Sequence, residues 1–232
     1  MKDKLVVSEK FYSIQGEGQT MGIPSVFVRL AGCNLLCKSS SWVCDSIEVW
    51  QKGLPVSFEE LLTLEEVVKL QAGAHLIFTG GEPLLHQKKV AKYVAWFEDE
   101  YFFKPTIEVE TNGTIIPSLD MMKVVDYWNC SPKLANSGES YDRRVKPEAI
   151  RALNCYDKTI FKFVIFDKDD LETVLSDYGE FIDRSKIVLM PAGEDQEKLA
   201  KTRPLVASIC IDQCLRYSDR LHIVIWNLKT GV

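Results

Sequence analysis

Apolar, β-branched runs alternate with segments of helical spacing along most of this sequence, and this alternation restricts its fold more than any other feature. The runs predict strands at 24–30, 75–78, 106–110, 124–128, 159–166, 186–190 and 221–226. The helical spacing predicts helices at 58–70, 88–100, 147–153, 169–181 and 194–214. Because alternating strands and helices build parallel sheets with crossover helices, we expect an α/β protein, either an open doubly wound sheet or a barrel.

Turn residues follow three of the predicted strands. They are 79–81 (TGG), 111–113 (TNG) and 191–193 (PAG). Since parallel α/β folds carry their active sites at the carboxyl ends of the strands, these turns are the first candidates for a functional site. The polar stretch 136–146 (NSGESYDRRVK) predicts a mobile loop.

Size and charge restrict the class of protein. A chain of 232 residues with 46% hydrophobic residues and no internal repeat or linker predicts a single domain over residues 1–232. The net charge of -5 argues against a protein that coats nucleic acid and favours a small-molecule substrate. No apolar run is long enough to cross a bilayer and no signal peptide is recognisable, so we expect a cytoplasmic protein without a membrane partner.

Three of the seven cysteines, Cys33, Cys37 and Cys44, share one loop after the first predicted strand. Thiolates bind both zinc and iron–sulfur clusters, so ligand number has to decide between them. A structural zinc site normally closes with four ligands, and none of the three histidines has a paired ligand spacing. Three thiolates favour a [4Fe–4S] cluster with one open iron. Zinc completed by a distant ligand, a disulfide and simple core packing are the alternatives.

The other cysteines are expected to be structural. Cys130, Cys155, Cys210 and Cys214 lie in predicted strands or helices, where a free cysteine usually packs as a small buried hydrophobe.

Longer motifs carry a resemblance to a known family. They are 11–18 (FYSIQGEG), 27–34 (FVRLAGCN), 44–46 (CDS), 79–83 (TGGEP), 110–114 (ETNGT), 131–133 (SPK), 161–164 (FKFV) and 189–191 (LMP). The Cys-x3-Cys start and the GGEP segment are similar to the radical S-adenosylmethionine superfamily. The SIQGEG motif ahead of the cysteines resembles more specifically the 7-carboxy-7-deazaguanine synthases. One departure is the six residues between Cys37 and Cys44, where the superfamily usually has two; Cys44 is kept as a ligand because Asp45-Ser46 follows it, as in the family.

The resemblance implies a fold and a reaction. The fold is a partial, TIM-like barrel of mostly parallel strands. The reaction converts 6-carboxy-5,6,7,8-tetrahydropterin to 7-carboxy-7-deazaguanine by hydrogen abstraction and ring contraction with loss of ammonia. A [4Fe–4S] cluster, S-adenosylmethionine and Mg²⁺ are the implied cofactors. The implied partners are an electron donor such as flavodoxin or ferredoxin and a second copy in a homodimer.

It also implies roles for individual residues. For S-adenosylmethionine, Gly80 and Gly81 allow close backbone approach and Glu82 pairs with the ammonium. The ribose or methionine part is bound by Glu110, Thr111 and Asn112, and the carboxylate by Ser131 and Lys133. The adenine is flanked by Leu189, Met190 and Pro191. For the substrate, the residues are Ile14, Gln15, Glu17, Arg29, His222 and the C-terminal Val232. For Mg²⁺, they are Ser46 and Asp45. Each residue alone is also compatible with a cap, a surface salt bridge or core packing.

Two other functions are compatible with parts of the sequence. One is another small radical S-adenosylmethionine enzyme, such as an activase that abstracts hydrogen from a protein glycine, which would not need the motif around Gln15 and Glu17. The other is a non-catalytic module in which zinc holds the cysteine loop.

Overall fold

The computed structural model describes residues 3–39, 43–44, 46–229 and 231. Nine strands form one sheet in the order β3-β1-β2-β4-β5-β6-β7-β8-β9. The strands are β1 (Lys4–Ile14), β2 (Pro24–Leu30), β3 (Leu54–Ser57), β4 (His75–Gly80), β5 (Thr106–Thr111), β6 (Tyr127–Cys130), β7 (Thr159–Ile165), β8 (Ile187–Pro191) and β9 (Arg216–Tyr217).

The sheet is mostly parallel and open. Neighbouring strands are parallel from β2 to β9, whereas β1 is antiparallel to both β2 and β3. Over the described residues β3 and β9 are the two ends of the strand order, so the curved sheet does not close. The predicted α/β class with an incomplete TIM-like barrel is therefore confirmed.

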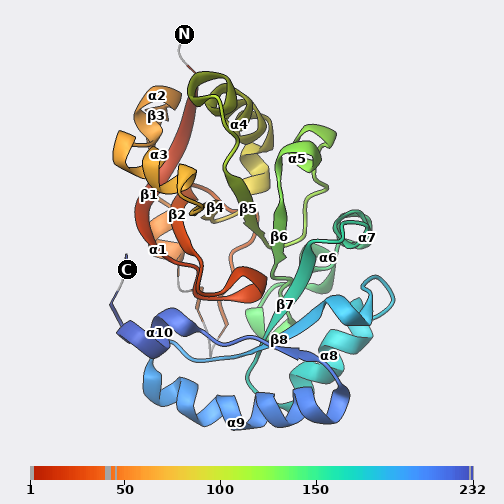
Figure 1. Ribbon diagram of the computed structural model, residues 1–232. Coiled ribbons are helices and arrows are strands. Elements are labelled where there is room, and N and C mark those ends of the chain that lie inside the picture. Colours follow the sequence, from red (N-terminus) through yellow and green to blue (C-terminus); the bar gives the residue numbers. More distant parts are fainter. Residues whose placement is uncertain (1–2, 40–42, 45, 230, 232) are drawn as a thin grey trace.

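Helices pack around the outside of this sheet (Figure 1). They are α1 (Ile47–Trp50), α2 (Phe58–Leu61), α3 (Leu64–Gln71), α4 (Gln87–Tyr101), α5 (Leu119–Val124), α6 (Tyr141–Arg144), α7 (Pro147–Asn154), α8 (Lys168–Tyr178), α9 (Gln196–Gln213) and α10 (Leu221–Trp226), with short 3-10 turns η1 (Gly18–Thr20), η2 (Pro83–His86), η3 (Ala135–Ser137) and η4 (Arg184–Lys186). None of the helices in the described part of the chain is long and apolar enough to cross a membrane.

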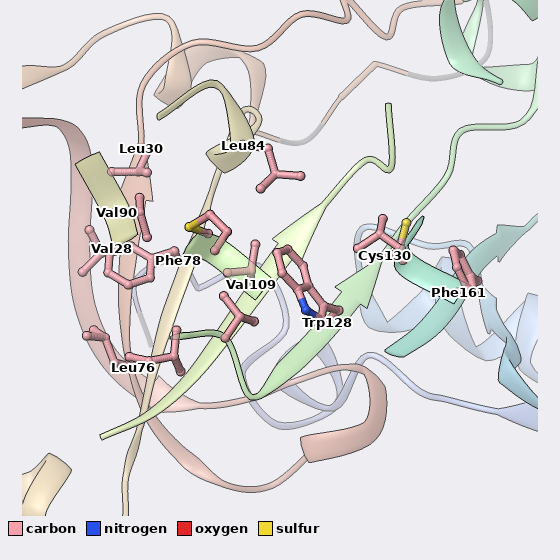
Figure 2. Packing of buried hydrophobic residues seen from close by; sticks show 14 of the residues in the cluster. Val28, Leu30, Leu76, Phe78, Leu84, Val90, Val109, Trp128, Cys130 and Phe161 are labelled. Carbon is pink, nitrogen blue, oxygen red and sulfur yellow. The ribbon is translucent and has the colours of Figure 1, made fainter. Parts of the chain in front are cut away.

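The two faces of the sheet differ because successive side chains of a strand point to opposite sides. On β5, Ile107 and Val109 belong to the hydrophobic core, while Glu108 and Glu110 point to the other face. Figure 2 shows the apolar face, where residues of β2, β4, β5, β6 and β7 pack together, among them Val28, Phe78, Val109, Trp128 and Phe161. The opposite, concave face is polar, and it carries the candidate site.

Most predicted elements are confirmed. The strands predicted at 24–30, 75–78, 106–110, 159–166 and 186–190 correspond to β2, β4, β5, β7 and β8, and four of the five predicted helices correspond to α4, α7, α8 and α9. The helix predicted at 58–70 is two helices, α2 and α3, because Thr63 begins a new helix through a capping box with Glu66. The predicted strand 124–128 begins later, because Val124 ends α5.

Three predictions are wrong or incomplete. The run 221–226, predicted as a strand, is helix α10: the edge of β8 is already paired with β9, and the backbone amide of Leu221 donates instead to the carbonyl of Gly16. The strands β1, β3 and β9 were not predicted at all. The stretch 136–146 is not a featureless loop, because it contains most of η3 and all of α6 and buries Ser137, Glu139 and Arg144.

Candidate active site

The cysteine loop follows β2 and is closed by backbone contacts. The amide of Cys44 donates to the carbonyl of Cys37 over 3.0 Å, and Lys38 and Val43 form an antiparallel bridge. Cys37 is buried, while Cys33 and Cys44 are partly exposed. The three thiols therefore gather in one closed loop at the carboxyl end of β2.

Burial keeps two of these thiols protonated. It raises the pKa of Cys37 to about 11, although the nearby charge of Lys133 opposes the rise. It also raises the pKa of Cys33, against a hydrogen bond from the amide of Leu35. Because a metal ligand must be a thiolate, binding a cluster here has to release protons.

Neighbouring loops fix the cysteine loop from two sides. Asn112, after β5, donates to Asn34 over 3.0 Å and lies 3.9 Å from the sulfur of Cys33. On the other side, buried Glu139 accepts a hydrogen bond from the amide of Leu36. The stretch around Glu139, which the sequence predicts as a mobile loop, is thus a support of the cysteine loop.

The glycines after β4 are required by this packing. A Cβ on Gly80, whose φ is +137°, would lie 2.2 Å from the carbonyl oxygen of Leu30. A Cβ on Gly81 would lie 2.1 Å from the carbonyl oxygen of Gly32. The two glycines allow the loop after β4 to lie directly on the backbone that leads into Cys33.

Glu82 joins the loops after β4 and β5. Its carboxylate, which has no exposed surface, accepts hydrogen bonds from the Thr111 hydroxyl at 2.8 Å, the Asn112 amide at 2.7 Å and the Leu84 amide at 2.9 Å. Burial raises the pKa of Glu82 in spite of these donors. Among the described residues no cation forms an ion pair with this carboxylate.

A hydrogen-bond network covers the concave face around Gln15. The side-chain amide nitrogen of Gln15 donates to Glu108 at 2.8 Å and to Glu110 at 3.0 Å. Its oxygen accepts the backbone amide of Glu17 at 3.2 Å. Glu108 also accepts from Thr20 and Asn129, and Glu110 accepts from Thr79 over 2.6 Å. The network fixes the segment 15–20 against the inner face of β4, β5 and β6.

Glu17 lies between two cations that the sequence did not single out. Its carboxylate pairs with Lys162 of β7 through one oxygen and with Arg220 through the other, the second contact measuring 3.0 Å. Although burial alone would raise the pKa of Glu17, the charges of Lys162 and Arg220 hold it well below its usual range. Glu17 is therefore a fixed carboxylate.

His222 lies at the same place. A Cβ on Gly16 would lie 2.1 Å from the Nδ1 of His222, so the glycine makes room for the imidazole. Burial lowers the pKa of His222, which the charge of Glu17 opposes. The sequence predicted this histidine in the site, but the structure puts it on helix α10 and not on a strand.

Arg29 belongs to the same concave face near the cysteine loop. It is opposite Glu9 in the register of β1 and β2, and its Nε lies 3.8 Å from the Glu9 carboxylate. It stands one residue before Leu30, which ends β2. The Nε atom is buried without a hydrogen-bond acceptor among the described residues.

The remaining predicted residues are distributed around this face. Ser131 and Lys133 line a small hollow of about 20 Å³ after β6. Met190 and Pro191 are buried at the end of β8. Ile14 ends β1 and, with Tyr12, Pro24 and Trp226, lines an open hollow of about 370 Å³ at the other end of β2 from the cysteines. The polar chemistry, and not this larger hollow, marks the candidate site.

The predicted Mg²⁺ residues are only partly described. Ser46 precedes α1, its side chain makes no capping hydrogen bond, and its Oγ lies 3.5 Å from the sulfur of Cys44. Asp45 and Val232 lie outside the described residues. Within the described ranges, no three His, Cys, Asp or Glu side chains form a group that could hold a metal ion.

The donor set nevertheless fits a cluster. Three soft donors share one loop, and Cys37 interacts electrostatically with both Cys33 and Cys44. The other cysteines lie elsewhere. Cys130 and Cys210 are buried, as expected, but Cys155 and Cys214 are exposed, because each follows the last turn of a helix and is not inside it.

Lys162, Arg220, Glu108 and Glu139 were missed by the sequence analysis. Two of them left a signal. Lys162 and Glu108 interrupt apolar strands with a charge, and a charge inside a buried strand is costly unless it is paired. Arg220 left none, because its partner Glu17 is far away in the sequence. Glu139 has a local partner in Arg143, but the amide of Leu36 that links it to the cysteine loop is far away in the sequence.

A family model and several known proteins match this chain. A family model described as a 4Fe-4S single cluster domain matches residues 14–131. The 7-carboxy-7-deazaguanine synthase of Halobacterium salinarum is 34% identical over 96% of this chain and 91% of the relative. That of Pyrobaculum aerophilum is 33% identical over 97% of this chain and 96% of the relative.

A solved structure shares the fold. The crystal structure of QueE from Escherichia coli matches with a TM-score of 0.68 at 24% identity and covers 94% of this chain and 95% of that chain. At this identity the match supports the architecture, including the open sheet, and not the roles of single residues.

Proposed function

Because this chain belongs to the family of 7-carboxy-7-deazaguanine synthases, radical S-adenosylmethionine enzymes of 7-deazapurine biosynthesis, we propose that its concave face binds 6-carboxy-5,6,7,8-tetrahydropterin beside the cysteine loop. The observation that carries this proposal is the ionised Glu17 held on the polar face of the sheet. A pterin ring presents paired hydrogen-bond donors on one edge, and a carboxylate is their natural acceptor.

In this proposal Cys33, Cys37 and Cys44 hold a [4Fe–4S] cluster. With S-adenosylmethionine, a cluster held there would supply the radical that removes the substrate hydrogen. The protein holds both molecules in register and excludes other hydrogen donors. The closed loop and its supports, Asn112 and Glu139, favour this task because they fix the cysteines in position.

The loops after β4, β5 and β6 form the proposed S-adenosylmethionine site. Glu82 is a buried carboxylate that forms no ion pair among the described residues, although the charge of Lys133 acts on it, and the ammonium of the methionine part would provide a direct partner. Its bonds to Thr111 and Asn112 also brace the loops that Gly80 and Gly81 bring onto Cys33. The other proposed contacts are Glu110 for the ribose, Ser131 and Lys133 for the carboxylate, and Met190 with Pro191 for the adenine.

Arg29 is the proposed partner of the substrate carboxylate. Its guanidinium is on the concave face near the cysteines. The contact with the Glu9 carboxylate is long, at 3.8 Å, so the guanidinium donors are available to the substrate carboxylate. Glu17 binds the pterin edge, and His222 borders the ring. Ile14 lines the hollow at the other end of β2, so of the predicted substrate residues it has the least structural support. Gln15 contributes by position, since its amide group is already bonded to Glu17, Glu108 and Glu110.

Mg²⁺ is a further part of the proposal. The Ser46 hydroxyl is free of a capping role and lies next to the cysteine loop, and Asp45 follows Cys44 directly. Oxygen donors of this kind, completed by substrate oxygens and water, suit Mg²⁺. The ion would join the substrate carboxylate to the protein.

Several wider properties are proposed with the function. A single domain over residues 1–232 is supported by the one sheet that contains all nine described strands. An electron donor such as flavodoxin or ferredoxin, a homodimer and a cytoplasmic location stay predictions.

Anaerobic reconstitution with iron and sulfide, followed by product analysis with the carboxytetrahydropterin, tests the function. We expect turnover to 7-carboxy-7-deazaguanine that depends on S-adenosylmethionine and a reductant. A reconstituted protein that cleaves S-adenosylmethionine but never converts this pterin would favour another radical enzyme, such as the glycyl-radical activase. Zinc without sulfide in the purified protein would favour the structural zinc module.

A further inference from the structure

We infer that Lys162 is a positioning residue for substrate recognition, which acts by keeping Glu17 ionised and oriented towards the pterin. This inference rests on the proposed function, because it concerns the same binding face. Nothing in the sequence motifs assigns the lysine a role beyond its place in a strand.

The geometry isolates the pair from solvent. The side chain of Lys162 is 6% exposed and that of Glu17 is 15% exposed, and the ammonium contacts one carboxylate oxygen directly. Lys162 comes from the middle of β7, a rigid element, whereas Glu17 belongs to the segment between β1 and η1. The strand therefore supplies the fixed partner and the segment supplies the recognition group.

The second oxygen of Glu17 has a different partner. Arg220 contacts it at 3.0 Å through Nε and also donates to the carbonyl of Gly193 at 2.9 Å through its terminal nitrogen. The carboxylate is thus bound by Lys162 from the sheet and by Arg220 from the segment before α10. Each of its oxygens keeps a second acceptor position available for a ligand.

Charges from three elements face this carboxylate. They are Lys162 on β7, Arg220 before α10 and His222 on α10, while Glu110 on β5 acts on Lys162 from the other side. Burial would lower the pKa of Lys162, but Glu17 and Glu110 together raise it, so the ammonium stays charged. Without Lys162, Arg220 would be the remaining charged partner that opposes the effect of burial on Glu17 at neutral pH, because the lowered pKa of His222 leaves its imidazole neutral there.

The consequence is a pH dependence that the wild-type protein lacks. In Lys162→Met the pKa of Glu17 should rise, so the fraction of carboxylate falls at neutral pH and recovers as the pH is raised. The KM for the carboxytetrahydropterin should rise on the order of tenfold to hundredfold at pH 7. This increase should shrink towards about pH 9, while Lys162→Arg should restore a flat profile.

The experiment is a double-mutant cycle on the reconstituted enzyme, with KM and kcat measured from about pH 6 to pH 9. Variants are Lys162→Met, Glu17→Gln and the pair together. If the lysine acts through Glu17, adding Lys162→Met to Glu17→Gln changes KM little and adds no pH dependence. An undiminished effect in the Glu17→Gln background would mean that Lys162 touches the substrate itself, and would overturn the inference.

Controls separate this result from loss of folding and from failure of the proposed function. Lys186→Met is the control variant. Lys186 lies outside the site and donates to the carbonyls of Asn154 and Tyr156, so the dependence of KM on pH in this variant should match that of the wild type. If Lys162→Met does not fold, Arg220→Gln should show a smaller KM increase with the same pH trend, and a pH-independent increase there would overturn the inference. Absence of turnover in the wild-type enzyme would instead refute the proposed function.

Discussion

The two halves of the site are held in opposite ways. Around Glu17 the charged side chains already have protein partners: Lys162 and Arg220 bind the carboxylate, and Gln15 is bonded at both ends of its amide. Around the cysteines, by contrast, Glu82 and the thiols of Cys33 and Cys37 accept hydrogen bonds or lie near Lys133, but none of them forms an ion pair among the described residues. The Cys33 and Cys37 thiols have raised pKa values.

The difference indicates which half needs its ligands to be complete. A buried ion pair fixes its groups before any substrate arrives, so recognition is preorganised. The cysteine loop instead gains its charge balance only when metal and S-adenosylmethionine bind, because both its thiols and the nearby Glu82 are penalised by burial. Substitutions in one half therefore test whether the other half depends on it.

The largest effect should come from the cluster ligands. Serine at Cys33, Cys37 or Cys44 should abolish the iron–sulfur absorption and the activity, because a hydroxyl is a poor ligand for this cluster. Serine at Cys155 or Cys214 should leave iron and sulfide content unchanged, since both are exposed and distant from the loop in sequence. Full cluster content in Cys44→Ser, or its loss in Cys155→Ser, would contradict the assignment.

The next effect concerns stability of the recognition half. Glu17→Gln leaves buried Lys162 without its partner and should lower the free energy of unfolding by about 3 to 5 kcal/mol at neutral pH. Since the pKa of Glu17 is lowered by folding, its contribution is present above the usual glutamate pKa of about 4.3 and is lost as the pH falls below it. Denaturant titrations of both proteins should therefore converge in acid.

A second ion pair provides the control for this prediction. Arg144 and Asp177 are paired at 2.7 Å and buried to a similar degree, but they lie outside the site. Asp177→Asn should lower stability without changing the KM for substrate. If Glu17→Gln is as stable as wild type at every pH, the ion pair does not preorganise the recognition half.

The sequence marks candidates for the cysteine half more readily than for the recognition half, for a physical reason. The three candidate ligands Cys33, Cys37 and Cys44 share one short loop, so they are neighbours in the sequence. Glu17 instead pairs with Lys162 and Arg220, which are far from it in the sequence and approach it only in the folded protein. No local pattern encodes such a contact.

The same reason explains the largest error in the fold. The β-branched run 221–226 has strand composition, but its conformation depends on whether a strand edge is free at that point. Since β9 already covers β8, the run forms α10 and places His222 beside Gly16. The secondary structure predicted for His222 was therefore wrong, and its role in binding substrate stays a prediction.

A smaller effect is expected at Glu82, in the cysteine half. Glu82→Ala should weaken S-adenosylmethionine binding tenfold to hundredfold, which corresponds to the roughly 1.5 to 3 kcal/mol of a charge-assisted hydrogen bond. The cluster should stay, because Glu82 is not an iron ligand. Calorimetric titration of the reconstituted protein measures the affinity.

Glu139→Ala is the matched control for Glu82. Glu139 is also a buried carboxylate that accepts a backbone amide, that of Leu36, next to the cysteines. It should lower thermal stability and, compared at equal cluster content, reduce the affinity for S-adenosylmethionine much less than Glu82→Ala does, because Glu139 supports the cysteine loop without binding the ammonium. Equal losses of affinity in both variants would mean that Glu82 only braces the loops.

The smallest effect should come from Ser46, the proposed Mg²⁺ ligand in the cysteine half. Its hydroxyl lies beside Cys44 and is not used as a helix cap, so its loss should not disturb α1. Ser46→Ala should lower turnover of the carboxytetrahydropterin and weaken its response to added Mg²⁺. It should leave uncoupled cleavage of S-adenosylmethionine largely intact, because that step needs the cluster and the cofactor site but not the ion.

Residual activity is expected in Ser46→Ala because Mg²⁺ keeps several waters, and one of them can replace the hydroxyl. Ser57→Ala, in the capping box of α2, is the control for general effects of serine removal and should retain the wild-type Mg²⁺ response. Titration of Mg²⁺ against product formation in all three proteins decides the matter. Superimposable curves for wild type and Ser46→Ala would place the ion elsewhere. The halves would then be connected by protein contacts, such as those of Glu110 with Gln15 and Thr79, without help from the ion.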